Sequence, residues 1–215
     1  KPVQIGIIGL GTVGAGTVNL LKENAEEITR RAGRQINIRA VAVNDIAKQR
    51  ACEISEFQLT DDPFEVTDDP QIDLIVELVG GESTAREVVL RALEHGKHVV
   101  TANKALIAIH GNEIFDVALG KGLVVAFEAA VAGGISIIKV LREGLAGNRI
   151  ERVIGIINGT TNFILSEMHK KATPFSGVLV EAQRLGYAES DPSFDVEGID
   201  AAHKLTILSS VAFGI

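Results

Sequence analysis

The stretch "VQIGIIGLGTVGAG", residues 3–16, is an apolar run that breaks into the pattern G-x-G-x-x-G at Gly9, Gly11 and Gly14. The run is typical of a buried strand, and a helix is predicted to begin near Thr12. Unpaired N–H groups and the positive end of the helix dipole would face this turn, where a pyrophosphate can bind. Gly9 permits the tight turn, Gly11 lets the backbone approach a phosphate, and Gly14 lets the helix pack closely on the strand. Glycines that serve packing alone would give the same pattern, but its place between a strand and a helix favours a dinucleotide site.

The first part of the chain alternates β-rich runs with amphipathic stretches. This alternation indicates an α/β fold, a Rossmann-type doubly wound parallel sheet. We predict strands at 3–9, 36–43, 73–79, 97–101 and 122–127. We predict helices at about 12–28, 45–56, 83–95 and 104–119. Two Asp-Pro steps, at 62–63 and 69–70, predict a loop and a helical turn, because a residue before proline disfavours the helical conformation.

The residue composition changes after Glu128, where the loop "AAVAGGIS" consists mostly of small residues. We therefore divide the chain into a dinucleotide-binding domain, residues 1–128, and a partial α+β domain, residues 129–215. In the second domain we predict a strand at 150–157 and helices at about 135–144, 161–171, 174–185 and from Ile199 onward. The chain starts at Lys1 rather than Met and stops inside an apolar helical pattern, so we expect it to be a fragment.

Composition narrows the class of protein. The net charge of -7 and the scarcity of aromatic residues, 4% with no Trp, disfavour nucleic-acid binding. No uninterrupted apolar run is long enough to predict a membrane span, and no signal peptide is visible. Cys52 is the single cysteine, which excludes an internal disulfide and a Cys-based zinc site and fits a cytoplasmic location.

The choice between NAD and NADP stays open at this level. The second predicted strand ends at Asn44 and Asp45, and the Asp45 carboxylate could accept hydrogen bonds from ribose hydroxyls, which favours NAD. Lys48 and Arg50 lie within reach of the same loop and could neutralise a 2′-phosphate, which favours NADP. Charges at a predicted helix start are also common as plain caps.

Two lysines lie in apolar surroundings. Lys104 is the only charge in "VVTANKALIAI" and follows the end of a predicted strand, the edge of an α/β sheet where ligands bind. A lysine that snorkels to solvent from a helix start is the alternative. In the last helix, Asp200 and Lys204 are four residues apart and share one face, and the apolar composition of the helix predicts that this pair lines a cavity. A lysine there could exchange protons near neutral pH, whereas His203 points elsewhere and is predicted to be structural.

The loop "GYAESDPSFDVEG", residues 186–198, is acidic and contains Glu189, Asp191, Asp195 and Glu197. It is either solvated surface or a site that holds an amino group, since a carboxylate is the natural partner of an ammonium. No set of His, Asp and Glu has the spacing of a transition-metal site. The sequence leaves open whether loop carbonyls between Glu128 and Ile135 hold a hard cation.

Four segments, in this order and spacing, resemble the homoserine dehydrogenase family. They are "GIIGLGTVGAG" (6–16), "VVTANKALIA" (99–108), "GIINGTTNFIL" (155–165) and, most specifically, "GYAESDPSFDVEGIDAAHKL" (186–205). The resemblance spans the whole chain, although the family continues beyond Ile215 and many members add a regulatory domain. It implies NAD(P)-dependent interconversion of L-aspartate 4-semialdehyde and L-homoserine in threonine, methionine and isoleucine biosynthesis. It also implies a homodimer formed through the second domain.

The resemblance implies roles for individual residues. Lys204 would be the catalytic acid/base with Lys104 beside it, Glu189 would hold the substrate's ammonium group, and Asp200 would orient the same end. The implied cofactor contacts for NADP or NAD are Gly9, Gly11, Thr12, Val13, Gly14, Asn44, Lys104 and Gly186. The implied sodium ligands are main-chain oxygens of Glu128, Val131, Gly133 and Ile135. Many members carry an arginine where this chain has Asn44, which weakens the case for NADP.

Two other functions compete with this interpretation. A semialdehyde dehydrogenase needs a cysteine nucleophile, and Cys52 is predicted inside the second helix, away from the ligand edge of the sheet, so we reject it. A non-catalytic NAD(P)-sensing module would need the glycine turn but neither Lys204 nor Glu189. Substitution of Lys204 separates that module from an enzyme.

Overall fold

The structure, a computed structural model, describes all residues 1–215. It divides into two compact units, Lys1–Gly133 and Gly134–Ile215. This division lies close to the boundary that the sequence places after residue 128.

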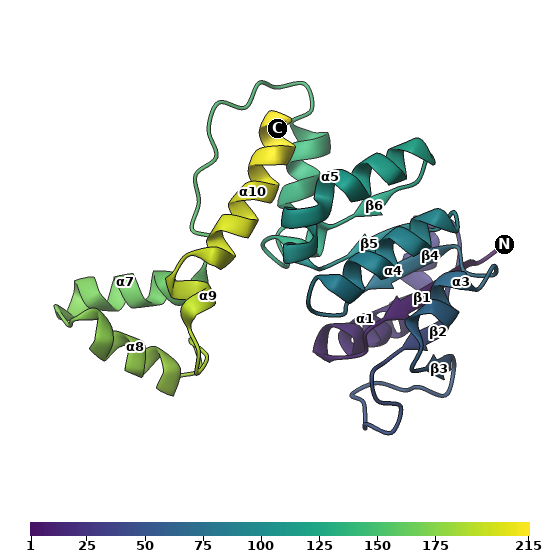
Figure 1. The fold of residues 1–215 in the computed structure, drawn as a ribbon, viewed down its shortest axis with the longest axis horizontal. Helices are drawn as coiled ribbons and strands as arrows, with labels where there is room; N and C mark the ends of the chain where they lie inside the picture. The colour runs from purple at the N-terminus through teal and green to yellow at the C-terminus, as the bar shows by residue number, and fades with distance from the viewer. The chain divides into compact units, whose positions relative to one another are not determined.

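The first unit is built on a six-stranded, wholly parallel sheet with the strand order β3-β2-β1-β4-β5-β6 (Figure 1). The strands are β1 (Val3–Ile8), β2 (Ile36–Ala42), β3 (Gln58–Thr60), β4 (Leu74–Glu77), β5 (His98–Thr101) and β6 (Val125–Ala126). From β1 the chain adds β2 and β3 on one side and then crosses over to add β4, β5 and β6 on the other side, so the strand order reverses beside β1. In such sheets ligands bind at the carboxyl ends of the strands beside this reversal. The predicted Rossmann-type α/β fold is confirmed.

Helices pack along the sheet and are joined to it by short loops (Figure 1). They are α1 (Thr12–Glu23), α2 (Ala25–Ala32), α3 (Pro63–Asp68), α4 (Ser83–Glu94), α5 (Lys104–Gly120) and a 3₁₀ turn, η1 (Glu128–Ala130). The core between β1, β2 and α1 is aliphatic and contains Ile5, Ile7, Val18 and Val41. The carboxyl-terminal parts of these strands, residues 5–8 and 40–42, are buried on both faces, which explains why these parts are continuous apolar runs.

The second unit is helical. Its elements are α6 (Ile137–Lys139), the π-helical turn η2 (Val140–Gly144), α7 (Gly159–Lys171), α8 (Phe175–Arg184), α9 (Ser193–Val196) and α10 (Ile199–Phe213). A small core of Ile164, Val178, Ala182 and Ala188 joins α7, α8 and the loop that follows them. Three of the four helices predicted for this part of the chain are found close to their predicted bounds, as α7, α8 and α10. The helix predicted at 135–144 is instead the short α6 followed by the π-helical turn η2.

The predicted helix at 45–56 is wrong, because this segment forms turns and irregular backbone. The Asp45 carboxylate accepts a hydrogen bond from the Ala47 N–H at 2.9 Å, and the Glu53 carboxylate accepts from the N–H groups of Ile54 and Ser55 at 3.0 Å. Such local bonds give the backbone an alternative to a helical ladder. Cys52 therefore lies in this loop and not, as predicted, inside a helix. The predicted helix at 12–28 is also interrupted, since α1 ends before Asn24 and α2 begins after it.

The predicted strand at 150–157 is likewise not formed. Its alternating sequence favours a strand, but a strand requires a partner for its N–H and C=O groups. Every strand of the structure belongs to the sheet of the first unit, so none pairs with this segment. The side chains of Ile154 and Ile156 are 81% and 78% exposed.

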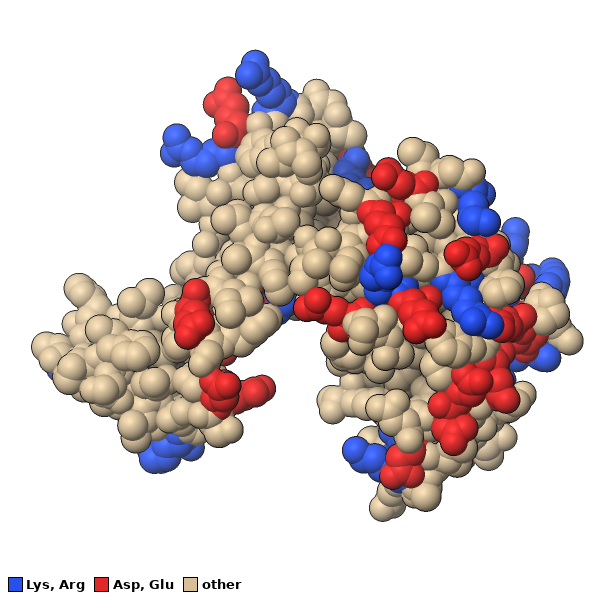
Figure 2. Space-filling view, in the orientation of Figure 1, with Lys and Arg blue, Asp and Glu red and all other residues tan.

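No helix has the length and apolarity that crossing a membrane requires. Acidic and basic side chains are interspersed over much of the visible face of the first unit, whereas the visible face of α7 and α8 is mostly uncharged (Figure 2). Leu165 and Val180, one on each of these helices, are each 65% exposed.

Candidate functional site

The turn between β1 and α1 has the geometry of a phosphate-binding loop. Gly9 has a φ of +101°, and a Cβ atom there would lie 2.7 Å from the Leu78 carbonyl oxygen. A Cβ on Gly14 would lie 2.3 Å from the Gly9 carbonyl oxygen, so α1 can only pack here without one. By contrast, a Cβ on Gly11 would meet no protein atom within 4 Å. The space over Gly11 is therefore open to a ligand, whereas Gly9 and Gly14 are required by the protein's own backbone.

The start of α1 offers unpaired N–H donors to that space. Gly11 is the N-cap residue of α1, no side chain caps this helix, and its first turn carries no acidic residue. Thr12 and Val13 are exposed in the first turn. The first N–H groups of a helix have no partner within the helix, so they point at whatever occupies the turn. The residues present thus fit a pyrophosphate group.

A cavity of about 390 Å³ lies beside this turn. It is lined by the end of β1 and the glycine turn, by the end of β2 with Asn44 and Asp45, and by the loop after β4. Lys48 and Arg50 lie on its wall, and Cys52 does not. Burial raises the pKa of the Cys52 thiol, which disfavours the thiolate that a nucleophile needs.

Arg50 links the two loops that face the cavity. Its guanidinium group donates to the Leu10 carbonyl at 2.9 Å and to the Asp45 carbonyl at 2.5 Å, while its Nε is buried without a partner. Arg50 therefore holds the loop after β2 against the glycine turn. Lys48, on the same wall, is exposed.

Lys104 is the first residue of α5, immediately beyond the carboxyl end of β5, and is half-buried. The preceding residue, Asn103, caps this helix by accepting from the Leu106 N–H at 3.0 Å, and its amide donates to the Gly81 carbonyl at 2.6 Å. The cap thus joins the start of α5 to the loop after β4. Lys104 consequently lies at the same edge of the sheet as the glycine turn.

A buried carboxyl group lies at the end of β4, next to this edge of the sheet. Glu77, the last residue of β4, has no exposed surface, and Thr101 donates to its Oε2 at 2.5 Å. The Thr101 hydroxyl in turn accepts from the Asn103 N–H at 2.9 Å. Burial raises the pKa of Glu77 to about 6, and the Thr101 hydroxyl opposes this rise. The second oxygen, Oε1, has no hydrogen-bond partner.

In the second unit, Asp200 and Lys204 form an ion pair of 2.6 Å on one face of α10. The Lys204 ammonium also donates to the Ile157 carbonyl at 2.7 Å. Asp200 is 6% exposed, and the Lys204 side chain is 22% exposed. The shared helix face predicted for these two residues is confirmed, and the ammonium is held in one place by two acceptors. The His203 ring packs edge-on against Phe194, and its Nδ1 is buried without a partner.

Asn158 connects this pair to the acidic loop, and sequence reasoning missed it. Its Nδ2 donates to Asp195 at 2.7 Å and to Asp200 at 2.9 Å, and its Oδ1 accepts from the Thr161 N–H at 2.8 Å. Asn158 is 8% exposed. A helix-capping signal at "NGTT" was available in the sequence, but it gave no indication of the two carboxylates.

The other predicted residues of the second unit lie on the surface. Glu189 is exposed in the loop between α8 and α9, where its carbonyl accepts from the Gln183 side chain at 3.1 Å. Gly186, with a φ of +78°, lies just beyond the end of α8. Both belong to the loop that leads into α9, the helix that carries Asp195.

The residues implied as sodium ligands lie in and after the turn η1. Glu128 begins this turn, and Val131 to Ser136 belong to no helix or strand, with positive φ angles at Ala132 and Gly134. The Ser136 carbonyl accepts the first helical hydrogen bond, from the Val140 N–H at 3.1 Å. The Ile135 carbonyl accepts one hydrogen bond, from the Ile137 N–H at 2.7 Å.

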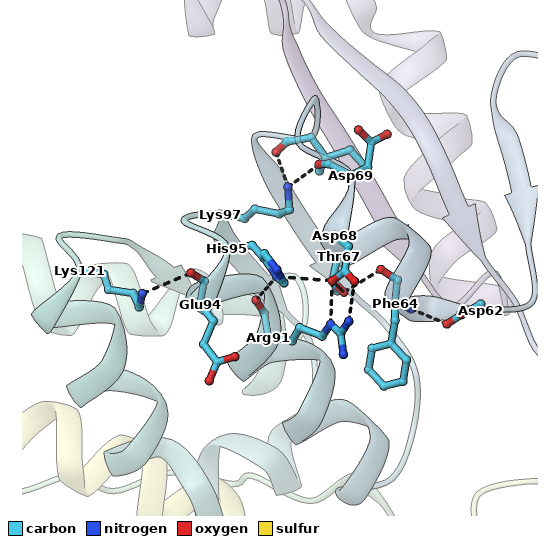
Figure 3. Close-up of polar contacts among 11 residues, drawn as sticks. Asp62, Phe64, Thr67, Asp68, Asp69, Arg91, Glu94, His95, Lys97 and Lys121 are labelled. Atoms are coloured by element: carbon cyan, nitrogen blue, oxygen red, sulfur yellow. Dashed lines mark hydrogen bonds and ion pairs between the residues drawn. The ribbon is translucent and has the colours of Figure 1, made fainter.

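A third polar cluster, at the amino edge of the same sheet, is structural (Figure 3). Arg91 of α4 donates to the Asp68 carboxylate of α3 at 2.7 Å and lies 4.7 Å from the centre of the Phe64 ring. Lys97 is 3% exposed and donates to the main-chain carbonyls of Asp69 and Ile72 at 2.5 and 2.9 Å. Burial lowers the pKa of Lys97. Arg91 thus fastens α3 to α4, and Lys97 fastens the turn before β4 to the start of β5, at the edge opposite the glycine turn.

Comparison with protein families gives two matches along the chain. Residues 9–128 match the model described as "Homoserine dehydrogenase, NAD binding domain", and residues 137–215 match the model described as "Homoserine dehydrogenase". Among curated proteins, the chain is 63% identical over 215 residues to a homoserine dehydrogenase of Pseudomonas aeruginosa and 43% identical to that of Bacillus subtilis. Both alignments include 100% of this chain, but they include 49% and 50% of those proteins. The chain therefore spans about half the length of the curated relatives it matches.

Solved structures give the same result. A homoserine dehydrogenase from Thiobacillus denitrificans superposes with a TM-score of 0.94 at 63% identity, over 100% of this chain and 50% of that one. A hyperthermophilic archaeal homoserine dehydrogenase in complex with NADPH superposes with a TM-score of 0.83 at 28% identity, over 100% of this chain and 71% of that one.

Proposed function

We propose, from the premise that this chain belongs to the homoserine dehydrogenase family, that the protein interconverts L-homoserine and L-aspartate 4-semialdehyde with NAD(P). The observation that carries this proposal is the ammonium of Lys204. It is held at 2.6 Å from Asp200 and 2.7 Å from the Ile157 carbonyl, and is therefore a proton donor in a fixed position. A fixed donor is what general acid catalysis requires.

In the direction of reduction, the Lys204 ammonium donates a proton to the aldehyde oxygen as negative charge develops there. In the reverse direction, the neutral amine accepts the proton of the homoserine hydroxyl. The nicotinamide group of the bound cofactor supplies or accepts the hydride. Asp200 stabilises the charged form of Lys204 and orients its N–H bonds, and general acid catalysis of this kind contributes ~10²–10⁴-fold to the rate. Lys104 is proposed as a second cation at the reacting oxygen.

Glu189 is proposed to bind the ammonium group of the substrate, and Asp200 to orient the same end of it. The support for Glu189 is an exposed carboxylate in the loop before α9, and Asn158 joins α9 to α10 through its bonds to Asp195 and Asp200. An exposed carboxylate can accept a charge-assisted hydrogen bond from a small ammonium ligand.

The cofactor is proposed to lie along the glycine turn, with the pyrophosphate over Gly11, Thr12 and Val13 and the adenosine end in the cavity beside Asn44. Gly186 is proposed to contact the nicotinamide end. Asp45 accepts the Ala47 N–H, which occupies one of its oxygens, while Lys48 is exposed on the cavity wall. We therefore expect the protein to bind both NADP and NAD, although Asn44 stands where many family members carry an arginine.

A sodium ion, a homodimer and a cytoplasmic location complete the proposal. The support for sodium is the irregular backbone at 131–135, since main-chain carbonyl oxygens suit a hard cation. The support for a dimer through the second unit is its exposed apolar surface, with Leu165 and Val180 each 65% exposed. Light scattering of the full-length protein, and activity in sodium against choline salts, test these two points. Microscopy of a tagged full-length protein tests the location.

The decisive experiment is an assay of the full-length protein with homoserine and each nicotinamide cofactor. We expect homoserine-dependent reduction of NAD or NADP that is lost in Lys204→Ala. A protein that binds NAD(P) but reduces none in the presence of homoserine would instead be a nucleotide-sensing module.

A further inference from the structure

Asn158 uses every hydrogen-bonding position of its side chain. The two N–H bonds of its amide point at two different carboxylates, those of Asp195 and Asp200. Its carbonyl oxygen accepts both from the N–H and from the hydroxyl of Thr161, each at 2.8 Å. An amide can donate two hydrogen bonds and accept two, so none is left over. If the amide were flipped, its oxygen would face both negatively charged carboxylates. Their charges therefore fix the orientation in which the NH₂ group faces them.

The arrangement brings together three segments that are distant in the sequence. Asp195 lies 37 residues after Asn158, on α9, and Asp200 lies 42 residues after it, on α10. Asn158 itself is the N-cap of α7. One buried amide thus fixes the relative positions of α7, α9 and α10.

The same oxygen of Asp200 serves two donors. Its Oδ2 accepts from Asn158 at 2.9 Å and from the Lys204 ammonium at 2.6 Å. The carboxylate is therefore shared, and its orientation toward Lys204 is set by the amide. Because Asn158 is uncharged, it separates Asp195 from Asp200 without adding a third negative charge next to the ammonium.

We propose that Asn158 is the positioning residue of the acid/base site, which holds Asp200 toward Lys204 and keeps the local charge low enough for Lys204 to release its proton. This inference rests on the proposed function. The charged side chains on the elements that pack against α10 are Asp195 on α9 and Arg142 and Glu143 on η2. Only Asp195 among these is joined to Asp200 through the amide.

The test uses the full-length protein and two variants that keep the helix cap. Ser and Asp are both good N-cap residues, so Asn158→Ser and Asn158→Asp preserve the start of α7. Asn158→Ser removes the bridging amide. Asn158→Asp is nearly isosteric but replaces a donor by a third carboxylate. We expect kcat to fall roughly ten- to a hundredfold in each, since a buried hydrogen bond to a charged group is lost.

A structural role alone would not alter the pH profile, and this is the readout that discriminates. In Asn158→Asp, an additional carboxylate favours the protonated form of a nearby ammonium. The rise of kcat for homoserine oxidation should therefore move about one pH unit higher. The double variant Asn158→Asp with Asp195→Asn restores an amide–carboxylate bond between these positions and should return part of the activity and of the shift.

Asn162→Asp is the matched control, because it makes the same change four residues later on the exposed surface of α7. It should leave kcat and the pH profile unchanged. Two outcomes would overturn the inference. In the first, Asn158→Asp has the same kcat and pH profile as the control. In the second, Asn158→Asp has a reduced kcat, its pH profile does not move and the double variant recovers no activity. If Asn158→Asp does not fold, a wild-type kcat in Asn158→Ser would overturn the inference.

A second readout does not depend on activity. Acetylation of the Lys204 amine by trace acetic anhydride, measured by mass spectrometry across pH, reports how readily this amine loses its proton. The half-labelling pH should rise by about one unit in Asn158→Asp and stay fixed in Asn162→Asp. If the wild-type protein oxidised no homoserine, the proposed function would fail, while this labelling would still support or overturn the role of Asn158.

Discussion

Lys204 and Asp200 lie one helical turn apart on α10 and meet across 2.6 Å, with the carboxylate nearly buried and the ammonium partly exposed. An exposed pair at this spacing contributes only about 0.3–0.5 kcal/mol to stability. The partial burial and the additional bond from Lys204 to the Ile157 carbonyl give this pair a fixed geometry that a surface pair lacks. Its value is therefore expected to lie in catalysis.

Replacing Lys204 by methionine should abolish turnover and leave cofactor binding intact. The apolar part of the side chain is kept, while the proton donor is lost, so we expect kcat to fall ~10²–10⁴-fold. The dissociation constant for NAD(P)H, measured by fluorescence of the reduced cofactor, should stay within about twofold. Lys170→Met, at an exposed position on α7, is the control. Wild-type turnover in Lys204→Met would refute its role as the acid/base.

The glycine turn allows a sharper test of the cofactor site, because its glycines have different neighbours. Gly11→Ala adds a methyl group that touches no protein atom, whereas the same change at Gly14 places one 2.3 Å from a backbone oxygen. We expect Gly14→Ala to destabilise the fold, by about 1–3 kcal/mol. Gly11→Ala should leave the melting temperature nearly unchanged and weaken NAD(P)H binding at least tenfold.

Gly16→Ala serves as the control for both, since it lies in α1, is exposed, and its added methyl group also meets no atom. It should slightly raise the melting temperature, because alanine is favoured over glycine inside a helix. Equal cofactor affinity in Gly11→Ala and Gly16→Ala would show that the pyrophosphate does not lie over Gly11.

The local pattern of the sequence predicted this turn and five strands of the parallel sheet, whereas the short strand β3 was missed. The predicted strands contain apolar runs that need only their own composition to be recognised, whereas β3 (Gln58–Thr60) has a single apolar residue. The segment 45–56 was mispredicted because Arg50 is bonded to the Leu10 carbonyl, 40 residues away, and Asp45 and Glu53 bond their own backbone. A window of sequence contains no information on such a distant partner.

The candidate site shows the same limit. The i, i+4 spacing of Asp200 and Lys204 predicted their pairing, because helix geometry alone brings them together. Asn158 was missed because its importance depends on two carboxylates that only the folded chain brings within 3 Å of it. The strand predicted at 150–157 failed for a related reason, since pairing requires a second strand that pattern alone does not supply.

Lys48 is expected to contribute to NADP selectivity, and Arg50 to the binding of both cofactors. Lys48 is exposed on the cavity wall, so Lys48→Ala should weaken NADPH binding roughly tenfold and leave NADH binding unchanged. The Arg50 guanidinium holds the glycine turn to the loop after β2, so Arg50→Met should weaken both cofactors. Titration of each variant with NADH and NADPH measures this. An equal loss of both cofactors in Lys48→Ala would contradict a specific contact with the 2′-phosphate.

The buried carboxyl group of Glu77 should make the stability of the first unit depend on pH. Burial raises its pKa from 4.5 to about 6, so the folded state retains this proton at pH values where the unfolded state has released it. Below pH 4.5 both states are protonated, and the contribution of protonated Glu77 to the free energy of unfolding is fully present. This contribution is lost as the pH rises through about 6, and the loss amounts to about 2 kcal/mol.

Glu77→Gln carries no such proton and should lack this dependence. The difference in the free energy of unfolding between Glu77→Gln and wild type should move in favour of the variant by about 2 kcal/mol from pH 4 to pH 7. Urea denaturation followed by circular dichroism at these pH values measures it. Thr101→Val is the companion variant, because the Thr101 hydroxyl donates to Glu77 at 2.5 Å and lowers its pKa. Without that hydroxyl the window should extend above pH 6. A pH-independent difference for Glu77→Gln would show that the pKa of this carboxyl group is the same in the folded and unfolded states.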